Sequence, residues 1–327
     1  MIHRQRRLML GLLPALFALL AAPSPAFAAE DGDFPQRSIE LVVPWQAGGG
    51  ADVVARAFSS AVAKHLPQPV VVVNKPGASG AIGIGDVIRA QPDGYRLVLA
   101  TSELVILRHL GMAKFSYTDL APVAGLNSDP AAIVVRADDP ARTLEDFLAK
   151  ARAQPGVLSI GNAGVGSTWH MAAAAFAAAS GTRYNEIPFP GGAPALLALL
   201  GGHIDAVSVS TAEASTYVDA GKLRILAVMA DKRERGFESV PTLKELGIDV
   251  SVEMWRGLAA PKNTPASVMA VLRVAAAKAV KEPAWLDTLA KLRFRTDSYA
   301  DAATLEAVMA KEDVFYGKLA GRLDVNN

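Results

Sequence analysis

A short apolar strand that runs through three glycines into a helix constrains the fold of this chain more than any other feature. Residues Ile39 to Val43 are apolar apart from Glu40, and Gly48, Gly49 and Gly50 follow. Apolar residues at helical spacing then predict a helix over Ala51 to Leu66, which Pro67 ends. Backbone N–H groups at the start of such a helix lack intrahelical partners and lie at the positive end of the helix dipole. The loop is therefore predicted to hold a carboxylate or a phosphate without a charged side chain.

The first 28 residues predict a cleaved secretory signal peptide. Three arginines precede an apolar run from Leu8 to Ala22, and the tripeptide Ala26-Phe27-Ala28 is a small-x-small cleavage pattern. The run is shorter than the ~18 residues expected of a spanning helix, so an uncleaved anchor is the less favoured alternative. We expect cleavage after Ala28 and a mature protein in the periplasm.

The composition excludes several classes of protein. The 327 residues include no cysteine, which rules out disulfides, thiol catalysis, thiolate metal ligands and a lipidated N-terminal cysteine. Without the predicted signal peptide the formal charge of +1 falls to about −2, so nucleic acid is not an expected partner. The remaining ~300 residues are more than one core usually supports and suggest two domains.

Strands and helices alternate along the chain, which predicts an α/β fold. The short apolar strands favour mostly parallel sheets flanked by helices on both faces. The predicted strands are Ile39–Val43, Val70–Val73, Arg96–Ala100, Pro122–Leu126, Ala132–Arg136, Leu158–Asn162, Tyr184–Pro188, Ile204–Val209, Leu223–Met229 and Val250–Leu258. The predicted helices are Ala51–Leu66, Ala81–Ala90, Thr143–Ala153, Thr168–Ala179, Ala193–Leu200, Ala266–Lys281, Trp285–Leu292 and Thr304–Leu319.

The order of these elements predicts two lobes joined by two crossings that form a hinge. The turn signal Asn127-Ser128-Asp129-Pro130 marks the first crossing, and the segment Val250–Leu258 reads as the crossing strand that returns. The expected division is a signal peptide over 1–28, the first part of lobe 1 over 29–127, lobe 2 over 128–249, and a return to lobe 1 over 250–327.

Three further loops are candidates for ligand contact. Gly161 to Thr168 has the glycine spacing of a phosphate loop but lacks the lysine that contacts the phosphates in such loops. Gly48 to Gly50 does not match a dinucleotide-binding fingerprint, because the next strand ends in Asn74 where an acidic residue that binds the ribose is expected. Thr101-Ser102-Glu103 follows a strand, at the edge where open α/β sheets collect ligands, although capping of the next helix is an equal alternative. The turn from Pro188 to Pro194 delivers free N–H groups to another helix start.

The side chains beside these loops have two readings each. Trp45 suits packing over the carbon skeleton of a ligand rather than a core position, and Asp52 suits the helix dipole more than a ligand. Glu103 either accepts a hydrogen bond from an ammonium or hydroxyl group of the ligand or faces solvent. His170 either lines the cleft or packs elsewhere. The histidines have no acidic partners at triad or metal spacing and there is no G-x-S-x-G motif, so no catalytic residue, metal or cofactor is expected.

Taken together, the motifs resemble the Bug-type receptors, which are the extracytoplasmic solute-binding proteins of tripartite tricarboxylate transporters. The resemblance covers essentially the whole mature chain. The matching segments are Phe34-Pro35, Val43 to Asp52, Asn74 to Ala78, Pro92 to Tyr95, Gly164 to His170, Ala220 to Arg224, Val240 to Thr242, Trp255 to Gly257 and Pro261 to Pro265.

The resemblance implies a two-lobed periplasmic binding protein, type II-like, that closes over a small carboxylate and presents it to integral-membrane permease subunits without catalysing a reaction. It implies that the loop after the first strand and the Gly164–His170 loop hold the carboxylate, with Thr101, Ser102 and the turn from Pro190 completing the cleft. The candidate ligand-binding residues are Trp45, Gln46, Gly48, Gly49, Gly50, Ala51, Asp52, Thr101, Ser102, Glu103, Gly164, Gly166, Ser167, Thr168, His170, Pro190, Gly191 and Gly192.

Several points stay open at this level. Arg256, in a variant of the Trp-x-Gly motif that resembles members for di- and tricarboxylates, either supplies a positive charge to the ligand or pairs with an acid outside the cleft. The same cleft would serve a receptor that signals to a membrane sensor, and a secreted α/β enzyme is the remaining alternative. We expect a monomer, and the sequence does not name the ligand.

Overall fold

The computed structural model describes residues 34–321, so the predicted signal peptide lies outside the described residues. The strands are β1 (Ile39–Val43), β2 (Val70–Asn74), β3 (Arg96–Thr101), β4 (Leu120–Arg136), β5 (Ser159–Asn162), β6 (Asn185–Pro188), β7 (Ala206–Ser210), β8 (Leu223–Val228), β9 (Glu253–Pro261) and β10 (Ala300–Asp301). The helices are α1 (Gly50–Val62), α2 (Ala81–Ile88), α3 (Glu103–His109), α4 (Leu144–Ala153), α5 (Thr168–Ser180), α6 (Gly192–Leu200), α7 (Thr211–Asp219), α8 (Ala266–Ala279), α9 (Pro283–Lys291) and α10 (Ala302–Ala320). Two 3-10 turns span Ala78–Gly80 and Tyr117–Asp119.

The strands β1, β2 and β3 form a parallel set, with β1 in the centre and β9 antiparallel beside β3. Leu41 and Val43 of β1 pack in one cluster with apolar residues of α1, α8 and α9. Val42, one residue between them, packs instead in the cluster that includes residues of α2, α3 and α10. This alternation places helices on both faces of the sheet, as the short apolar strands predict.

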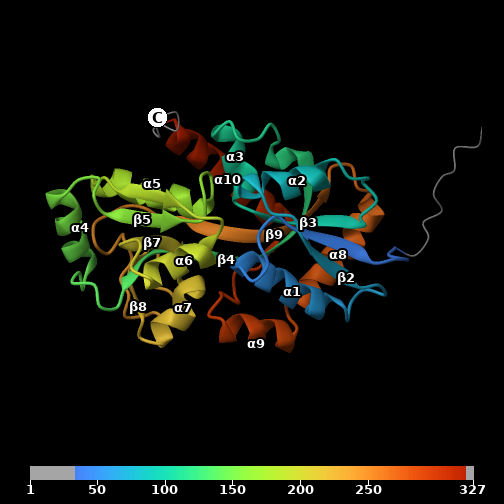
Figure 1. Cartoon of the computed structure of the whole chain (residues 1–327). Helices are drawn as coiled ribbons and strands as arrows, with labels where there is room; N and C mark the ends of the chain where they lie inside the picture. Colours follow the sequence, from blue (N-terminus) through green and yellow to red (C-terminus); the bar gives the residue numbers. More distant parts are fainter. Residues whose placement is uncertain (1–33, 322–327) are drawn as a thin grey trace, which may run out of the picture. The chain divides into compact units, whose positions relative to one another are not determined.

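A second set of strands follows the crossing. β5 lies between β6 and β7 and is parallel to both, while β4 runs antiparallel to β7 and β8. Helices α4 to α7 surround this set, and Figure 1 shows them together with β5, β7 and β8. The predicted α/β class, with helices that flank the strands, is confirmed. The sheet is mixed, because β4 and β9 run antiparallel to their neighbours while β1, β2 and β3, and β5, β6 and β7, are parallel sets.

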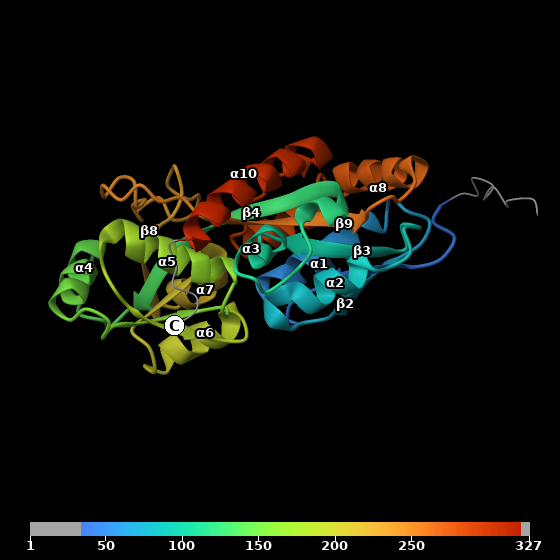
Figure 2. The same cartoon turned by 90° about the horizontal axis from the view of Figure 1, so that it is seen from above.

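The long strand β4 contradicts the predicted turn at residues 127–130. These residues continue the strand, and Asn127, Ser128 and Pro130 pair with residues of β9. The turn-forming side chains are occupied elsewhere: Asn127 donates to the Asp129 carboxylate at 2.7 Å, and Asp129 in turn accepts from Arg256 at 2.6 Å. β4 is therefore a single strand of 17 residues that pairs with both sets. Figure 2 shows β4 and β9 running beside each other between the two sets.

Helix α7 was not predicted, because its sequence from Thr211 to Asp219 is only weakly amphipathic. A capping box starts it: the Ser210 hydroxyl accepts from the Glu213 N–H at 3.1 Å, and the Glu213 carboxylate accepts from the Ser210 N–H at 3.3 Å. The Ser-x-x-Glu pattern at 210–213 was a readable sign of this helix start. The helix brings Glu213 toward the cavity described below.

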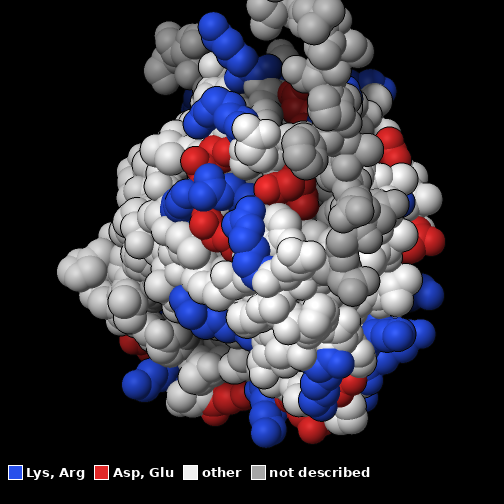
Figure 3. Space-filling view, turned by 90° about the vertical axis from the view of Figure 1, so that its right-hand side faces the viewer, with Lys and Arg blue, Asp and Glu red and all other residues white. Residues whose placement is uncertain are grey.

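The surface carries both signs of charge. On the face shown in Figure 3, lysine and arginine side chains are interspersed with aspartate and glutamate. Within residues 34–321, no helix has both the length and the apolar character needed to cross a bilayer. The residue boundaries of the two lobes stay a prediction.

Candidate functional site

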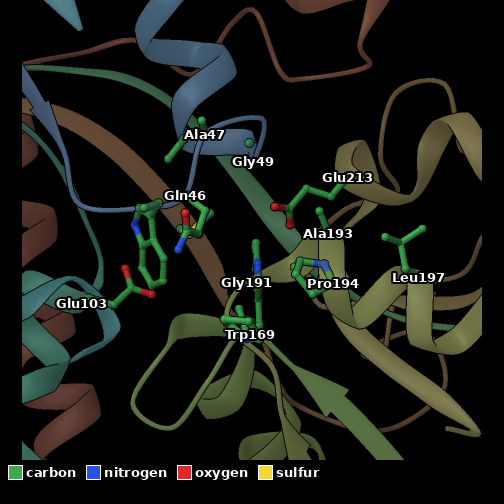
Figure 4. Close-up of a pocket in the computed structure, with 17 residues that line it drawn as sticks. Gln46, Ala47, Gly49, Glu103, Trp169, Gly191, Ala193, Pro194, Leu197 and Glu213 are labelled. Atoms are coloured by element: carbon green, nitrogen blue, oxygen red, sulfur yellow. The ribbon is translucent and has the colours of Figure 1, made fainter. Parts of the chain in front are cut away.

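A cavity of about 260 Å³ lies where the β1–α1 loop, the start of α3 and the β6–α6 turn meet. Nine of the candidate residues line it together, although they come from three separate parts of the sequence: Trp45, Gln46, Gly49, Gly50, Ala51, Glu103, Pro190, Gly191 and Gly192. Figure 4 shows this pocket with Gln46 and Gly49 on one side and Gly191 and Ala193 on another. The structure thus brings the first-strand loop and the Pro190 turn to one space.

Two helix starts face this cavity. Gly49 and Gly191 precede α1 and α6, and neither start has a capping side chain. The first-turn N–H groups of Gly50 and Ala51 in α1, and of Gly192 in α6, therefore have no side-chain acceptor from the cap residue. Because such groups carry partial positive charge, the cavity offers amide donors to an anion from two directions.

Asp52 and Gly48 shape the first of these loops from outside the cavity lining. The Gly48 N–H donates to Asp52 Oδ2 at 2.9 Å, and Asn74 Nδ2 donates to Asp52 Oδ1 at 2.9 Å. Arg56 contacts the same carboxylate at 3.0 Å. Burial opposes ionisation, but the hydrogen bonds from Arg56, Gly48 and Asn74 outweigh it and hold the pKa of Asp52 below its usual range. Asp52 therefore braces the glycine loop.

The start of α5 is already occupied by a carboxylate of the protein. Glu103 Oε1 accepts from the Thr168 N–H at 2.7 Å and from the Thr168 hydroxyl at 2.8 Å. Ser167 acts as the N-cap of the same helix, because its hydroxyl accepts from the His170 N–H at 3.1 Å. Gly164, Gly166, Ser167, Thr168 and His170 are not among the residues that line the cavity.

Thr101 and Ser102 lie behind the cavity wall and are fully buried. The Trp45 indole donates to the Thr101 hydroxyl at 3.3 Å, and that hydroxyl donates to Glu103 Oε2. Both oxygens of Glu103 are thus engaged, and the residue is only 1% exposed. Thr101 and Ser102 do not line the cavity; Thr101 instead helps to position Trp45 and Glu103, which do.

The comparisons with known proteins agree on one family. The family model described as "Tripartite tricarboxylate transporter family receptor" matches residues 54–316. The chain belongs to this family. The predicted resemblance is therefore confirmed, and the relatives are binding proteins of the two-lobed periplasmic type.

Individual relatives cover nearly the whole receptor. A curated protein of Cupriavidus necator, "UPF0065 protein in gbd 5'region", is 38% identical over 282 residues, 86% of each chain. A solved TctC solute-binding protein from Polaromonas, without ligand, is 51% identical with a TM-score of 0.72, covering 89% of this chain and 100% of the other. MatC from Rhodopseudomonas palustris with bound malate is 27% identical with a TM-score of 0.81, covering 88% and 100%.

The cavity of this receptor also contains residues that were not named individually as candidates, although Ala47, Ala163, Trp169, Ala193 and Pro194 lie inside the candidate loops. They are Ala47, Ala163, Trp169, Ala193, Pro194, Leu197, Glu213 and Met254. Trp169 neighbours the candidate Thr168, so the Gly164–His170 segment does reach the site, but through its indole rather than its hydroxyls. Glu213 was not a candidate because it lies in helix α7, which was not predicted.

Arg256 pairs with an acid below the cavity. It is fully buried, its Nη1 lies 2.6 Å from Asp129 Oδ2, and it is absent from the lining. Its Nε and Nη2 donate no hydrogen bond to any of the described residues, and Nη2 lies 3.1 Å from where a Cβ on Gly50 would stand. The guanidinium therefore lies directly under the first residue of α1.

His170 lies beside Glu186 outside the lining. Its Nδ1 accepts from the Gly166 N–H at 3.3 Å, and its Nε2 is 3.4 Å from Glu186 Oε2. Burial lowers the pKa of His170 and raises the pKa of Glu186 to about 7. Within the part of the chain that the structure describes, no group of three or more His, Asp or Glu side chains is placed to hold a metal ion.

Proposed function

We propose that this protein is a periplasmic solute receptor that captures a small carboxylate in the cavity and delivers it to integral-membrane subunits of a tripartite tricarboxylate-type transporter. The observation that carries the proposal is the pair of uncapped helix starts, α1 and α6, that face one cavity. Membership of the family and the malate bound by a related structure support the same conclusion.

The proposed mechanism is closure of two lobes over the ligand. The α1 start belongs to the first set of strands and the α6 start to the second, so a ligand that bridges them favours the closed arrangement. The strands β4 and β9, which run between the two sets, are the proposed hinge. No step of this mechanism requires a cofactor, a metal or a covalent reaction, and we propose that the protein acts as a monomeric binding protein without catalysis.

The test combines identification of the natural ligand with a defined panel. Native mass spectrometry of the protein as purified, from a periplasmic extract, reports any retained acid. Thermal shift and calorimetry with mono- and dicarboxylates, malate and adipate included, then rank affinities, and NMR of the same mixtures reports turnover. Saturable binding of a carboxylate without turnover supports the proposal; no binding by any acid, or conversion of one, contradicts it.

The delivery step has its own test. Deletion of the gene is expected to abolish uptake of the bound acid, and restoration by the wild-type chain supports a transport role. Unchanged uptake together with a lost transcriptional response to the acid would instead indicate a sensor.

A further inference from the structure

The two oxygens of the Glu213 carboxyl group have different surroundings. Glu213 enters the cavity lining from α7, on the side opposite Glu103 (Figure 4). Its Oε2 accepts hydrogen bonds from the N–H and the hydroxyl of Ser210, at 3.3 and 3.4 Å, and so takes part in the capping box of α7. Its Oε1 forms no hydrogen bond or ion pair with any residue of the described range 34–321.

The free oxygen lies against the two helix starts that line the cavity. An added Cβ would lie 3.2 Å from Oε1 at Gly50 and 3.1 Å from it at Gly192, and these glycines are the first residues of α1 and α6. A carboxylate bound by the first-turn N–H groups of both helices therefore lies next to Oε1. Because two carboxyl groups that share one site do not readily ionise together, one of them is expected to hold a proton.

The buried charges behind the cavity leave Glu213 disposed to be that group. Arg256 of β9 favours the ionised form of Glu213, but its guanidinium already pairs with Asp129 of β4 at 2.6 Å, and Asp129 favours the protonated form. Burial raises the pKa of Glu213, and this effect outweighs the opposing effect of Arg256.

The other elements around the cavity bring no cation to Glu213. α6 contains no charged residue, and Asp52 and Arg56 of α1 pair with each other outside the cavity lining. Glu103 of α3 is the second acid of the lining, and its Oε1 is engaged by Thr168. An uncharged hydrogen-bond donor is therefore the form of Glu213 that suits an anionic ligand.

We propose that Glu213 binds the ligand as a neutral carboxylic acid, in which Oε1–H donates a hydrogen bond to a carboxylate oxygen of the ligand while Oε2 continues to accept from Ser210. A protonated carboxyl group has one donor and one acceptor oxygen, which is the division that the capping box of α7 already imposes. Glu213 keeps its proton, so no reaction takes place. Binding is then strongest in acid and weakens as the pH rises through the ionisation of Glu213. This inference rests on the proposed function, because it specifies how one residue of the same cavity holds the carboxylate.

The experiment is calorimetry with succinate, malate and adipate from pH 5 to pH 9, on wild type and three variants. Glu213→Gln keeps an acceptor oxygen for Ser210 and offers an N–H donor in place of the acid proton, whereas Glu213→Ala offers neither. Glu245→Gln is the matched control, because Thr242 and Glu245 form the same reciprocal hydrogen bonds as Ser210 and Glu213, outside the cavity lining. Infrared difference spectra of the wild-type and Glu213→Gln complexes report the carbonyl stretch of a protonated side-chain carboxyl group.

For the acid that binds wild type most tightly, Glu213→Gln is expected to bind within threefold of wild type at pH 5, and Glu213→Ala at least tenfold more weakly. Wild type and Glu245→Gln should bind at least threefold more weakly at pH 9 than at pH 5, and Glu213→Gln should not. The infrared band should be present in the wild-type complex and absent from the Glu213→Gln complex.

Two results would overturn the inference and leave the carboxylate receptor standing. One is a Glu213→Gln affinity at least tenfold below that of wild type at pH 5, and the other is a wild-type complex without the infrared band, because both mean that Glu213 binds in its ionised form. If no acid binds at all, the proposed function fails, and the inference fails with it. The infrared comparison decides the matter even if Glu213→Ala does not fold.

Discussion

The Glu103 carboxylate, at the start of α3, accepts both the backbone N–H and the hydroxyl of Thr168, at the start of α5, 65 residues further along the chain. This contact joins the helix that follows β3 to the helix that follows β5. It also means that the start of α5, which the sequence offered as a ligand site, is filled by the protein itself. The uncapped helix starts that bring glycines to the cavity are those of α1 and α6.

Glu103→Gln should therefore lower stability as well as alter the cavity wall. The charged acceptor of the Thr168 N–H is lost, and we expect the free energy of unfolding to fall by about 1–3 kcal/mol. Urea unfolding followed by circular dichroism measures this. Glu145→Gln, an exposed acid in the first turn of α4, is the control and should change stability by less than about 0.5 kcal/mol. Equal effects of the two variants would contradict the structural role of Glu103.

Ser167→Ala separates capping from ligand contact. If the hydroxyl held the carboxylate of the ligand, its loss would weaken binding by about 1–2 kcal/mol. In the structure the hydroxyl caps α5. We therefore expect a loss of about 1 kcal/mol in stability with an unchanged dissociation constant. Weaker binding at wild-type stability would place Ser167 against the ligand.

Adjacent glycines before and at the start of α1 give a matched pair. A Cβ at Gly50 would meet Arg256 Nη2 at 3.1 Å and Glu213 Oε1 at 3.2 Å, whereas one at Gly49 would meet only the Gln46 carbonyl at 3.5 Å. Gly50→Ala is expected to weaken ligand binding at least tenfold, because the added methyl group displaces the Glu213 carboxylate and crowds the N–H groups of the first turn of α1. Gly49→Ala should change binding less than threefold. Calorimetry on both variants checks this, and similar affinities would show that the space beside Gly50 is not used.

Glu186 should make stability depend on pH near neutrality. Burial raises its pKa to about 7, above the ordinary value of 4.5, so the protonated form favours the folded state. That contribution is complete below pH 4.5 and is lost as the pH rises through 7. Relative to wild type, Glu186→Gln should thus gain up to about 3 kcal/mol in stability between pH 5 and 8. Denaturation curves at several pH values measure the gain, and a difference that does not vary with pH would contradict the raised pKa.

Hydrophobic periodicity predicted most of the helices and strands, because the spacing of apolar residues within each element reflects which of its positions are buried. β1 begins and ends at the predicted residues, Ile39 and Val43, and the helix after it differs from the prediction mainly at its C-terminal end. The failure at residues 127–130 has a different origin. Local preference for a turn was overridden by partners more than 100 residues away, above all Arg256, which no local pattern reveals.

The candidate site was predictable only as far as it is made of loops. The glycines that follow β1 and β6 predict helix starts, and the structure places these glycines around one cavity. Which helix start stays open depends on Glu103 reaching Thr168, and the place of Glu213 in the cavity lining depends on α7. The first is a relation between distant segments, so residue types and spacing did not contain it, whereas the start of α7 was readable locally in its Ser-x-x-Glu pattern.

The position of β9 between β3 and β4 bears on how the chain reaches its native state. Because the chain is synthesised from its N-terminus, β1, β2 and β3 can associate early. The edge of β3 that pairs with β9 stays unpaired until residues 253–261 have been synthesised. Helices α8 to α10, which cover that part of the sheet, come later still. The strands of the first third of the chain thus complete their pairing only after the last quarter has been synthesised. We expect a binding-competent cavity to form only when synthesis is nearly complete.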